Sequence, residues 1–351
     1  MSAAVQDEYG FEGKKNYRVV VTRHGGPEVL QAVVEDLPEP APGEVRVRVQ
    51  AAGVSAYDQM QRSSGSLPGT PQVPYTPGED IAGVVDKLGD GVTTFNLGQM
   101  VVGYPRGGGY AEFVCMAASE LVPVPEGVDP AQAVCLATNY LTAEMLLHPT
   151  ANVQPGERVL VHGAAGGVGS ALVELGKQFG LEMYGTASKY NHELVSRLGA
   201  TPIDYRTEDF VERIRSLTGD GVDAVFDPVG GASQIWRSYR TLRKGGRLIS
   251  FGMAATKKSG ARVIPFSLLV VVLLGLLPDG KQARMSPNLA VFAAENNDWY
   301  RDTLAKLLDA VAAGRIDPVV AERVPLTEAA RAHELIERGG YAGKVVLVPG
   351  A

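Results

Sequence analysis

The sequence predicts an α/β protein in which a partly open β-barrel of short strands is followed by a doubly wound parallel sheet. Three observations lead to this fold class. Short strands with regular turns fill the first third of the chain. After Pro130, strands and helices follow one another, as in a parallel sheet covered by helices on both faces. A glycine-rich turn at residues 163–169 separates the first of these strands from its helix.

The composition narrows the class of protein. With 351 residues, the chain is long enough for two domains, and 45% hydrophobic and 21% charged residues are ordinary for a globular protein. A net charge of −6 without a basic stripe argues against binding of nucleic acid. Two cysteines, Cys115 and Cys135, are too few for a disulfide framework or a four-cysteine zinc site. The first sixteen residues lack an apolar signal core, so we expect a cytoplasmic protein.

The first third of the chain carries the barrel pattern. Residues 17–22 and 45–49 alternate between apolar and polar side chains, and the proline-rich run at 38–43 forms a stiff turn between them. Further short strands are expected within 78–103 and at 110–116, before a loop at 123–130. Evenly spaced short strands of this kind are typical of a small barrel.

The pattern of the doubly wound sheet begins after this loop. A helix is expected at 131–147, and a final strand at 344–348. Strands and helices between them are expected at 158–161, 170–179, 181–187, 192–198, 210–217, 223–226 and 246–251. Helical segments alternating with short apolar strands predict the parallel sheet.

The turn at 163–169 predicts the opening of a dinucleotide-binding unit. Glycines allow a tight turn, close approach of a pyrophosphate, and close packing of helix on strand. Free N–H groups at the start of the helix then face the phosphates. The spacing is G-x-x-G-G-x-G rather than G-x-G-x-x-G, and the alternative is a glycine-rich loop between any strand and helix.

The next strand indicates which dinucleotide is bound. An NAD site requires an acidic residue at the end of this strand for the ribose 2′-hydroxyl, but the chain has Ser188 and Lys189 there. A hydroxyl and an ammonium group suit a 2′-phosphate, so the predicted cofactor is NADP(H). The alternative is a solvated lysine at the start of a helix.

An intensely apolar stretch occupies residues 263–277. It is shorter than the roughly 20 residues that span a membrane, and Pro265 interrupts it. A buried helix that lines a pocket or a subunit contact is therefore favoured over a membrane anchor. Because a helix that is apolar all round must be covered on every side or meet a partner, we expect a homodimer.

Nine segments carry a family resemblance over residues 17–349. They are HGGPEVL at 24–30, AAGVSAYDQMQRS at 51–63, PYTPGEDIAGVV at 74–85, NYLTAEML at 139–146, PGERVLVHGAAGGVG at 155–169, GTASK at 185–189, PIDYRTEDF at 202–210, GVDAVFDPVGG at 221–231 and GKVVLVPG at 343–350. Through them the chain resembles the zinc-independent quinone oxidoreductase (zeta-crystallin-like) branch of the medium-chain dehydrogenase/reductase superfamily. Within that branch it is most similar to the vesicle amine transport protein group.

The resemblance implies a GroES-like β-barrel catalytic domain at 1–135, completed by 290–351, and a Rossmann domain at 136–289, with NADP(H) in the cleft between them. It implies a pyrophosphate site at Ala165, Gly166, Gly167, Val168 and Gly169, and a 2′-phosphate site at Ser188, Lys189 and Tyr205. The implied nicotinamide site comprises Thr142, Phe251, Gly252, Met253 and Lys344, with Gly185 and Asp227 also beside the cofactor. Ser55 and Tyr57 are the candidate catalytic residues, and the alternative for Tyr57 is a packing role.

The chain departs from the zinc-dependent relatives at their metal ligands. Those relatives carry Cys where this chain has Ser55, and His-Glu where it has Glu79-Asp80. A hydroxyl and two carboxylates without imidazole or thiolate make a poor zinc site, so no metal is expected.

A site without a metal favours a particular reaction. Oxidation of an alcohol would lack its Lewis acid, whereas hydride addition to a conjugated acceptor spreads the charge into an enolate or hydroquinone. We therefore expect NADPH-dependent reduction of a quinone or an α,β-unsaturated carbonyl compound. The alternatives are a tailoring reductase for one bulky metabolite and a non-catalytic NADPH-binding or membrane-peripheral protein.

Overall fold

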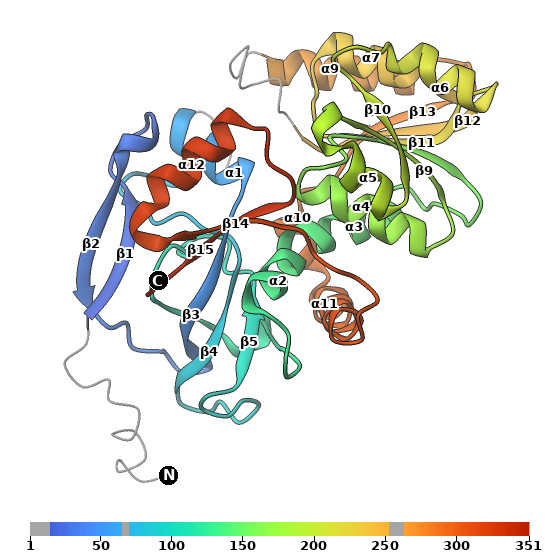
Figure 1. Ribbon diagram of the computed structural model, residues 1–351. Coiled ribbons are helices and arrows are strands. Elements are labelled where there is room, and N and C mark those ends of the chain that lie inside the picture. Colours follow the sequence, from blue (N-terminus) through green and yellow to red (C-terminus); the bar gives the residue numbers. More distant parts are fainter. Residues whose placement is uncertain (1–14, 65–69, 253–262, 351) are drawn as a thin grey trace.

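Two large β-sheets divide the molecule, one in each half, with helices between and around them (Figure 1). The computed structural model describes residues 15–64, 70–252 and 263–350. Among these residues no helix is both long and apolar enough to cross a membrane. The domain boundaries at 135/136 and 289/290 stay a prediction.

The barrel half combines strands from both ends of the chain. Its seven-stranded sheet has the order β14-β15-β3-β4-β5-β7, with β6 paired to β3 off this path. The bounds are β3 (Glu44–Val54), β4 (Ile81–Leu88), β5 (Met100–Gly103), β6 (Phe113–Ala117), β7 (Leu121–Pro123), β14 (Val320–Pro325) and β15 (Lys344–Val348). Val45, Val47 and Val49 alternate along β3 and are buried in the core of this half.

Shorter elements surround this sheet. A two-stranded ribbon of β1 and β2 lies beside it, and α1 and α12 contact each other next to it (Figure 1). The bounds are β1 (Lys15–Val21), β2 (Leu30–Asp36), α1 (Ala56–Ser64), α12 (Ala329–Arg338) and the short 3₁₀ turns η3 (Pro27–Val29), η4 (Ala118–Glu120) and η8 (Leu326–Glu328).

The other half is a doubly wound sheet of six parallel strands in the order β10-β9-β8-β11-β12-β13. Helices α6, α7 and α9 cover one face, and α4 and α5 cover the other (Figure 1). The bounds are β8 (Arg158–His162), α4 (Gly167–Gln178), β9 (Glu182–Ala187), η7 (Lys189–Asn191), α5 (His192–Leu198), β10 (Ala200–Asp204), α6 (Phe210–Thr218), β11 (Val222–Asp227), α7 (Ala232–Arg240), β12 (Leu242–Ser250), α9 (Val263–Gly275) and β13 (Gln282–Met285). The strand order reverses at β8, where open α/β sheets bind ligands.

A broken helix joins the two halves. One continuous helix was expected at 131–147, but π-helical turns interrupt it. The bounds are α2 (Pro130–Cys135), η5 (Leu136–Tyr140), α3 (Leu141–Met145) and η6 (Leu146–Thr150). Each π turn admits one extra residue and so rotates the side chains that follow, a change that no hydrophobic period reveals. Two helices from the C-terminal part of the chain, α10 (Leu289–Glu295) and α11 (Asn297–Ala312), pack against α3.

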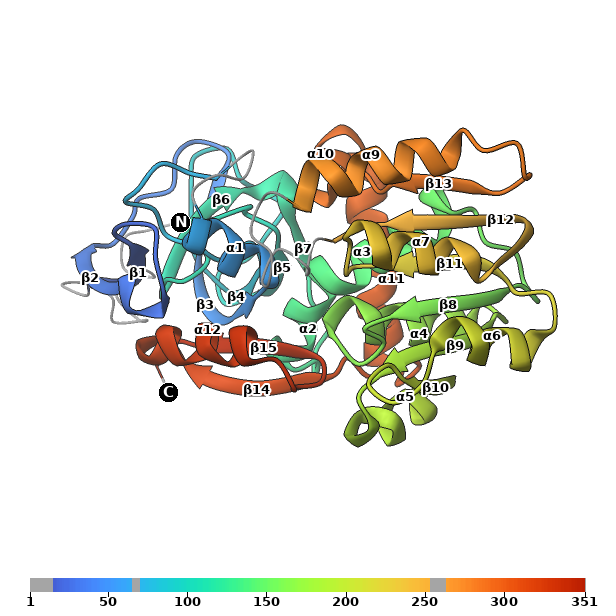
Figure 2. The same ribbon diagram turned by 90° about the horizontal axis from the view of Figure 1, so that it is seen from above.

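The apolar stretch at 263–277 forms α9, which is covered only on one side. Ser267, Val271 and Leu274 are buried, whereas Phe266 and Leu273 are 64% and 54% exposed. Figure 2 shows α9 and β13 together along one border of the molecule. Strand β13 ends the sheet, because it pairs with β12 alone among the described strands.

The glycine turn between β8 and α4 follows the predicted geometry. Gly163 adopts a φ of +65°, which a residue with a Cβ rarely takes. A Cβ at Gly169 would overlap the Gly163 carbonyl oxygen and lie 2.9 Å from the Ala164 Cα. The backbone of α4 therefore packs directly on the turn, and only glycine at 169 permits this approach.

Replacing Gly169 tests this packing. Gly169→Ala is expected to lower the free energy of unfolding by about 1–3 kcal/mol, because backbone atoms must move to admit the methyl group. In Gly166→Ala the Cβ meets only the Gly163 oxygen, at 3.3 Å, so this control should stay within about 1 kcal/mol of the wild type. Urea unfolding of the cofactor-free proteins measures the free energy of unfolding of both variants. Equal losses in the two variants would contradict the packing account.

Candidate active site

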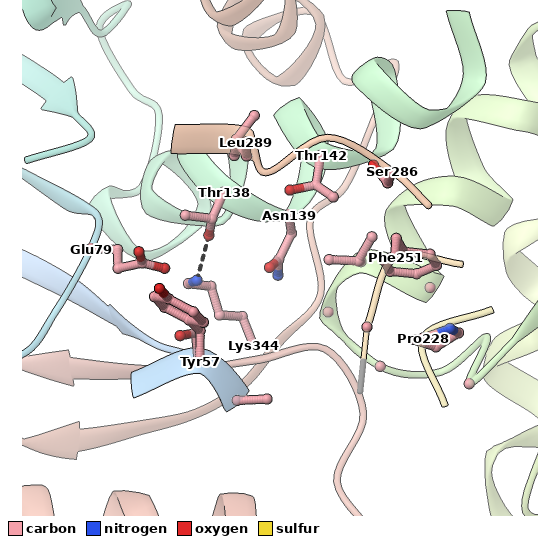
Figure 3. Close-up of a pocket in the computed structure, with 18 of the residues that line it drawn as sticks. Tyr57, Glu79, Thr138, Asn139, Thr142, Pro228, Phe251, Ser286, Leu289 and Lys344 are labelled. Carbon is pink, nitrogen blue, oxygen red and sulfur yellow. Dashed lines mark hydrogen bonds between the residues drawn. The ribbon is translucent and has the colours of Figure 1, made fainter. Parts of the chain in front are cut away.

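A cavity of ≈ 570 Å³ lies where the barrel half meets the glycine turn (Figure 3). The predicted site residues that line it are Ser55, Tyr57, Thr142, Gly166, Gly167, Val168, Gly169, Phe251, Gly252 and Lys344. Its lining also contains polar residues that the sequence did not single out as site residues, namely Glu79, Tyr104, Thr138, Asn139, Ser286, Asn288 and Tyr341. Predicted residue Met253 lies outside the described residues.

The glycine turn forms one wall of the cavity. The first N–H groups of α4 have no partner within the helix, and they lie at the carboxyl end of β8. The Ala165 carbonyl accepts a 2.8 Å hydrogen bond from the Gly343 N–H, which connects the turn to the start of β15. Gly185 lies on β9 beside the turn, where a Cβ would be 2.5 Å from that of Ala164. A pyrophosphate fits this wall, since anions bind at exposed helix N-termini.

The predicted 2′-phosphate residues gather at the ends of β9 and β10, away from the cavity lining. The Ser188 hydroxyl lies 3.2 Å from the Tyr205 hydroxyl, and Lys189 is exposed beside them. The hydrogen bond with Ser188 lowers the pKa of Tyr205. Arg206, which the sequence did not single out, lies 5.8 Å from the ring centres of both Tyr190 and Tyr205. Two cations and two hydroxyls at one corner suit a phosphate group.

Asp227 is buried beneath the cavity rather than lining it. One carboxyl oxygen accepts hydrogen bonds from the N–H groups of Val229 (2.7 Å) and Gly230 (3.1 Å), and the other accepts from the Ser238 hydroxyl at 2.8 Å. Because Ser238 donates its only proton to Asp227, the Nε2 of His162, 3.0 Å from the Ser238 oxygen, must be the donor to it. Asp227 therefore fixes the loop that places Pro228 in the cavity wall.

The π turn η5 directs polar side chains into the cavity. Thr138 and Asn139 interrupt an apolar helical stretch, and both line the cavity (Figure 3). A Cβ at Gly167 would overlap the Asn139 amide, so the glycine turn and η5 are in direct contact. The interruption of the apolar pattern was the sequence signal for these two residues, but the π geometry that orients them was not predictable.

A buried polar triad lies beside the cavity, and two of its members, Thr138 and Lys344, line it. The Lys344 ammonium lies 2.8 Å from the Asp80 carboxylate and donates to the Thr138 hydroxyl at 2.7 Å. Thr138 in turn donates to Asp80. Burial alone would lower the pKa of Lys344, but the attraction of Asp80 and its hydrogen bond outweigh this effect and raise it. Lys344, predicted to contact the nicotinamide, therefore stays charged and holds the barrel half to η5.

Ser55 and Tyr57 lie together at the start of α1. The Ser55 hydroxyl donates to Asp58 at 2.7 Å and accepts from the Asp58 N–H, while the Ser55 N–H donates back to the Asp58 carboxylate at 2.8 Å. This reciprocal pattern is a capping box, and it occupies the Ser55 hydroxyl within the helix terminus. Tyr57 lines the cavity, and burial followed by the nearby Glu79 charge raises its pKa.

Glu79 stands beside Tyr57 on the barrel side of the cavity (Figure 3). Tyr104 donates to one of its carboxyl oxygens at 3.4 Å. Burial, followed by the charges of Asp58 and Asp80, raises the pKa of Glu79 to about 8. In the sequence, Glu79 stands out only as a residue at a position where zinc-dependent relatives carry a metal ligand, because the contact with Tyr104 joins distant parts of the chain.

The cysteine and histidine ligands that zinc-dependent relatives carry are replaced here by Ser55 and Glu79. Ser55 is engaged with Asp58, and Asp80 is paired with Lys344. Within residues 15–64, 70–252 and 263–350, no group of three or more His, Cys, Asp or Glu side chains is arranged to hold a metal ion.

Comparisons with known proteins agree with the architecture. Residues 41–126 match the family described as alcohol dehydrogenase GroES-like domain, and residues 198–347 match the family described as zinc-binding dehydrogenase. The chain is 34% identical over 345 residues to the human synaptic vesicle membrane protein VAT-1 homolog, covering 95% of this chain and 86% of that protein. It is 32% identical over 345 residues to rat quinone oxidoreductase, covering 96% and 99% of the two chains.

A solved structure shows the same fold with a dinucleotide bound. The Escherichia coli quinone oxidoreductase in complex with NADPH superposes with a TM-score of 0.85 at 32% identity, covering 95% of this chain and all of that one. The predicted GroES-like and Rossmann architecture is thus confirmed. This chain belongs to the medium-chain dehydrogenase/reductase family, in the branch that contains the quinone oxidoreductases and the VAT-1 homologues.

Proposed function

We propose that this protein is a metal-independent reductase that uses NADPH to reduce a quinone or an α,β-unsaturated carbonyl compound. The observation that carries the proposal is one cavity that is lined on one side by the glycine turn at the start of α4 and on the other by a phenol and a carboxyl group. A cofactor and an acceptor can meet there. Relatives of about one third identity include quinone oxidoreductases, one of them solved with NADPH.

The chain's own residues provide a place for each part of the cofactor. The pyrophosphate would lie on residues 165–169, and the 2′-phosphate would contact Ser188, Lys189, Tyr205 and Arg206. The nicotinamide end would lie near Thr142, Phe251 and Gly252, which line the cavity. When bound, the nicotinamide supplies hydride.

The residues opposite the glycine turn suit a conjugated acceptor. A protein without a Lewis acid must stabilise developing negative charge with hydrogen-bond donors. Tyr57 provides one, since its raised pKa keeps the phenol protonated at neutral pH. Ser55 would act through the helix cap, as a positioning residue for Tyr57, because its hydroxyl is bound to Asp58.

We also propose a homodimer formed along α9 and β13, in a protein of the cytoplasm. Among the described strands, β13 pairs with β12 alone, so its outer edge can pair with another strand, and the exposed side of α9 is apolar. A second copy can cover both, and Ile264 at the start of the same helix lines the cavity. A dimer would thus hold the wall of the site in place.

The reaction is tested with purified protein dialysed against a chelator. NADPH oxidation is expected with members of a panel of simple quinones and enones, at a rate that dialysis leaves unchanged. Failure with every acceptor would contradict the reductase assignment, and it would favour a single bulky substrate or a non-catalytic role. Stoichiometric zinc that is lost together with activity would contradict metal independence.

The choice of cofactor is tested at Lys189. The wild type should bind NADPH more tightly than NADH, and Lys189→Ala should weaken NADPH binding by about 1.5–3 kcal/mol through loss of one charge-assisted contact. NADH binding should not change. Lys306→Ala on α11 is the control for removal of a surface charge. Calorimetric titration that finds equal affinity of the wild type for both cofactors would rule out this assignment.

The dimer is tested by light scattering. We expect twice the chain mass of 37.1 kDa at micromolar concentration, and a monomer when Leu273 and Leu276 are both replaced by Glu. Val34→Glu, at an equally exposed apolar residue on β2, is the control and should leave the dimer intact. A monodisperse wild-type monomer would exclude the proposed dimer.

A further inference from the structure

Glu79 is a carboxyl group in the wall of the cavity, and it takes part in none of the salt bridges among the described residues. We propose that Glu79 is the proton donor of the reduction, delivering its carboxyl proton to the oxygen of the acceptor as hydride arrives. This inference rests on the proposed function, and it assigns the proton transfer to a residue other than the candidate catalytic residues Ser55 and Tyr57. Figure 3 shows Glu79 on the barrel side, beside Tyr57 and across the cavity from Phe251.

The backbone on both sides of Glu79 is fixed. The Gly78 N–H donates to the Asp58 carboxylate at 2.9 Å, and the Gly53 N–H donates to the Asp80 carbonyl at 3.1 Å. The Glu79 carbonyl itself accepts from the Arg106 N–H at 3.3 Å. Hydrogen bonds before, at and after the residue hold its side chain toward the cavity, as an oriented donor requires.

One oxygen of the Glu79 carboxyl group is available to a substrate. Tyr104 donates to Oε1, whereas the described residues make no hydrogen bond to Oε2. The residue lines the cavity together with Tyr57, Met60 and Tyr341, so a substrate placed there contacts it. The site therefore presents a carboxyl oxygen and the Tyr57 hydroxyl to the same space.

The groups that face Glu79 favour its neutral form. Asp58 of α1 and Asp80, next in sequence, are carboxylates, and Tyr57 and Tyr104 are phenols. Among the described residues, Lys344 of β15 is the cation that acts on Glu79, but it is paired with Asp80 at 2.8 Å and opposes the carboxylates only in part. Burial and the two carboxylates thus raise the pKa of Glu79 to about 8, so most molecules carry the proton at neutral pH. A pKa near the working pH is what an effective general acid needs.

Other donors in the cavity are less suited to release a proton. The Ser55 hydroxyl is hydrogen-bonded to Asp58. The Lys344 ammonium forms a salt bridge with Asp80 and a hydrogen bond with Thr138. Tyr57 has a raised pKa, so it can hydrogen-bond an oxyanion but gives up its proton reluctantly. This leaves Glu79 as the acid and Tyr57 as the hydrogen-bond donor.

For an enone, hydride addition and proton transfer together give the saturated ketone. Hydride from a reduced nicotinamide forms a C–H bond at the β-carbon, and the electron pair of the C=C bond moves toward the carbonyl oxygen. The O–H bond of Glu79 breaks as an O–H bond forms on that oxygen, which gives the enol and a Glu79 carboxylate. Solvent then returns the proton to Glu79, and the enol becomes the ketone. With a quinone, the same proton completes the hydroquinone.

The first test needs no turnover. In the cofactor-free protein, the infrared band of a protonated carboxyl group is expected at pH 7 and should disappear as the pH rises through about 8. The component that titrates near pH 8 should be missing in Glu79→Gln and present in the control Glu120→Gln, whose carboxylate pairs with Arg106 outside the cavity lining. Buried Asp58, whose pKa is also raised, can contribute a band in both variants, so the comparison is between titrations. A wild type without this component, or a Glu79→Gln variant that keeps it, would overturn the proposal.

The second test measures hydride transfer in a single turnover with NADPH and an acceptor that the wild type reduces. The wild-type rate constant should be at its maximum below pH 8 and should fall above it, because Glu79 must carry its proton to act as the acid. Glu79→Gln should be slower by roughly 10²-fold and lose this pH dependence, while its affinity for NADPH and its melting temperature stay unchanged. In Tyr104→Phe the break in the pH profile should move upward, since the hydrogen bond from Tyr104 lowers the pKa of Glu79.

The results separate this proposal from the function on which it rests. If the wild type reduces none of the acceptors, that result contradicts both the reductase assignment and the role of Glu79. A wild type that reduces them, while Glu79→Gln keeps the wild-type rate and pH profile, overturns the role of Glu79 alone.

Discussion

The buried contact between Lys344, Asp80 and Thr138 is the interaction on which the architecture of the site depends. It joins the last strand of the chain, the segment before β4 and the π turn that leads into the Rossmann half. A Cβ at Gly53 would overlap both Lys344 and Asp80, so β3 also packs directly against the pair. Removing one partner of such a buried pair leaves an uncompensated charge, which costs more than the intact pair contributes.

The same contact determines the chemistry of the cavity. Because the Lys344 ammonium pairs directly with Asp80, it offsets only in part the burial and the carboxylate charges that raise the pKa of Glu79. The pairing thus separates two adjacent carboxyl groups into a charged residue that holds the structure and a neutral residue that faces the substrate. An environment that raises the pKa of one carboxyl group is a common way to create an acid at neutral pH.

The sequence was most informative where function depends on backbone geometry. Gly163 and Gly169 could be assigned to the turn because a positive φ and a close backbone approach both require glycine. The alternation of strands and helices indicated the parallel sheet, since its period is local in the sequence. The exposed side of α9 was also foreseeable, because an apolar helix of that length exceeds what one domain can cover.

Residues that act through distant contacts were not predictable in the same way. Tyr104 meets Glu79, and Thr138 meets Lys344, across separations that no local pattern encodes. Ser55 and Asp227 were predicted at the site, but the three-dimensional structure shows them bonded to Asp58 and to the loop after β11. These hydrogen bonds support α1 and the loop after β11, and contact of Ser55 or Asp227 with a ligand stays a prediction.

The central claim is that cofactor and acceptor meet in the cavity between the glycine turn and the barrel. A crystal structure of the protein with NADP⁺ tests it most directly. The account predicts the pyrophosphate on the N-terminus of α4, the 2′-phosphate between Lys189 and Arg206, and the nicotinamide ring facing Tyr57 and Glu79 across open space. A nicotinamide ring turned away from these two side chains, or a dinucleotide bound elsewhere on the protein, would contradict it.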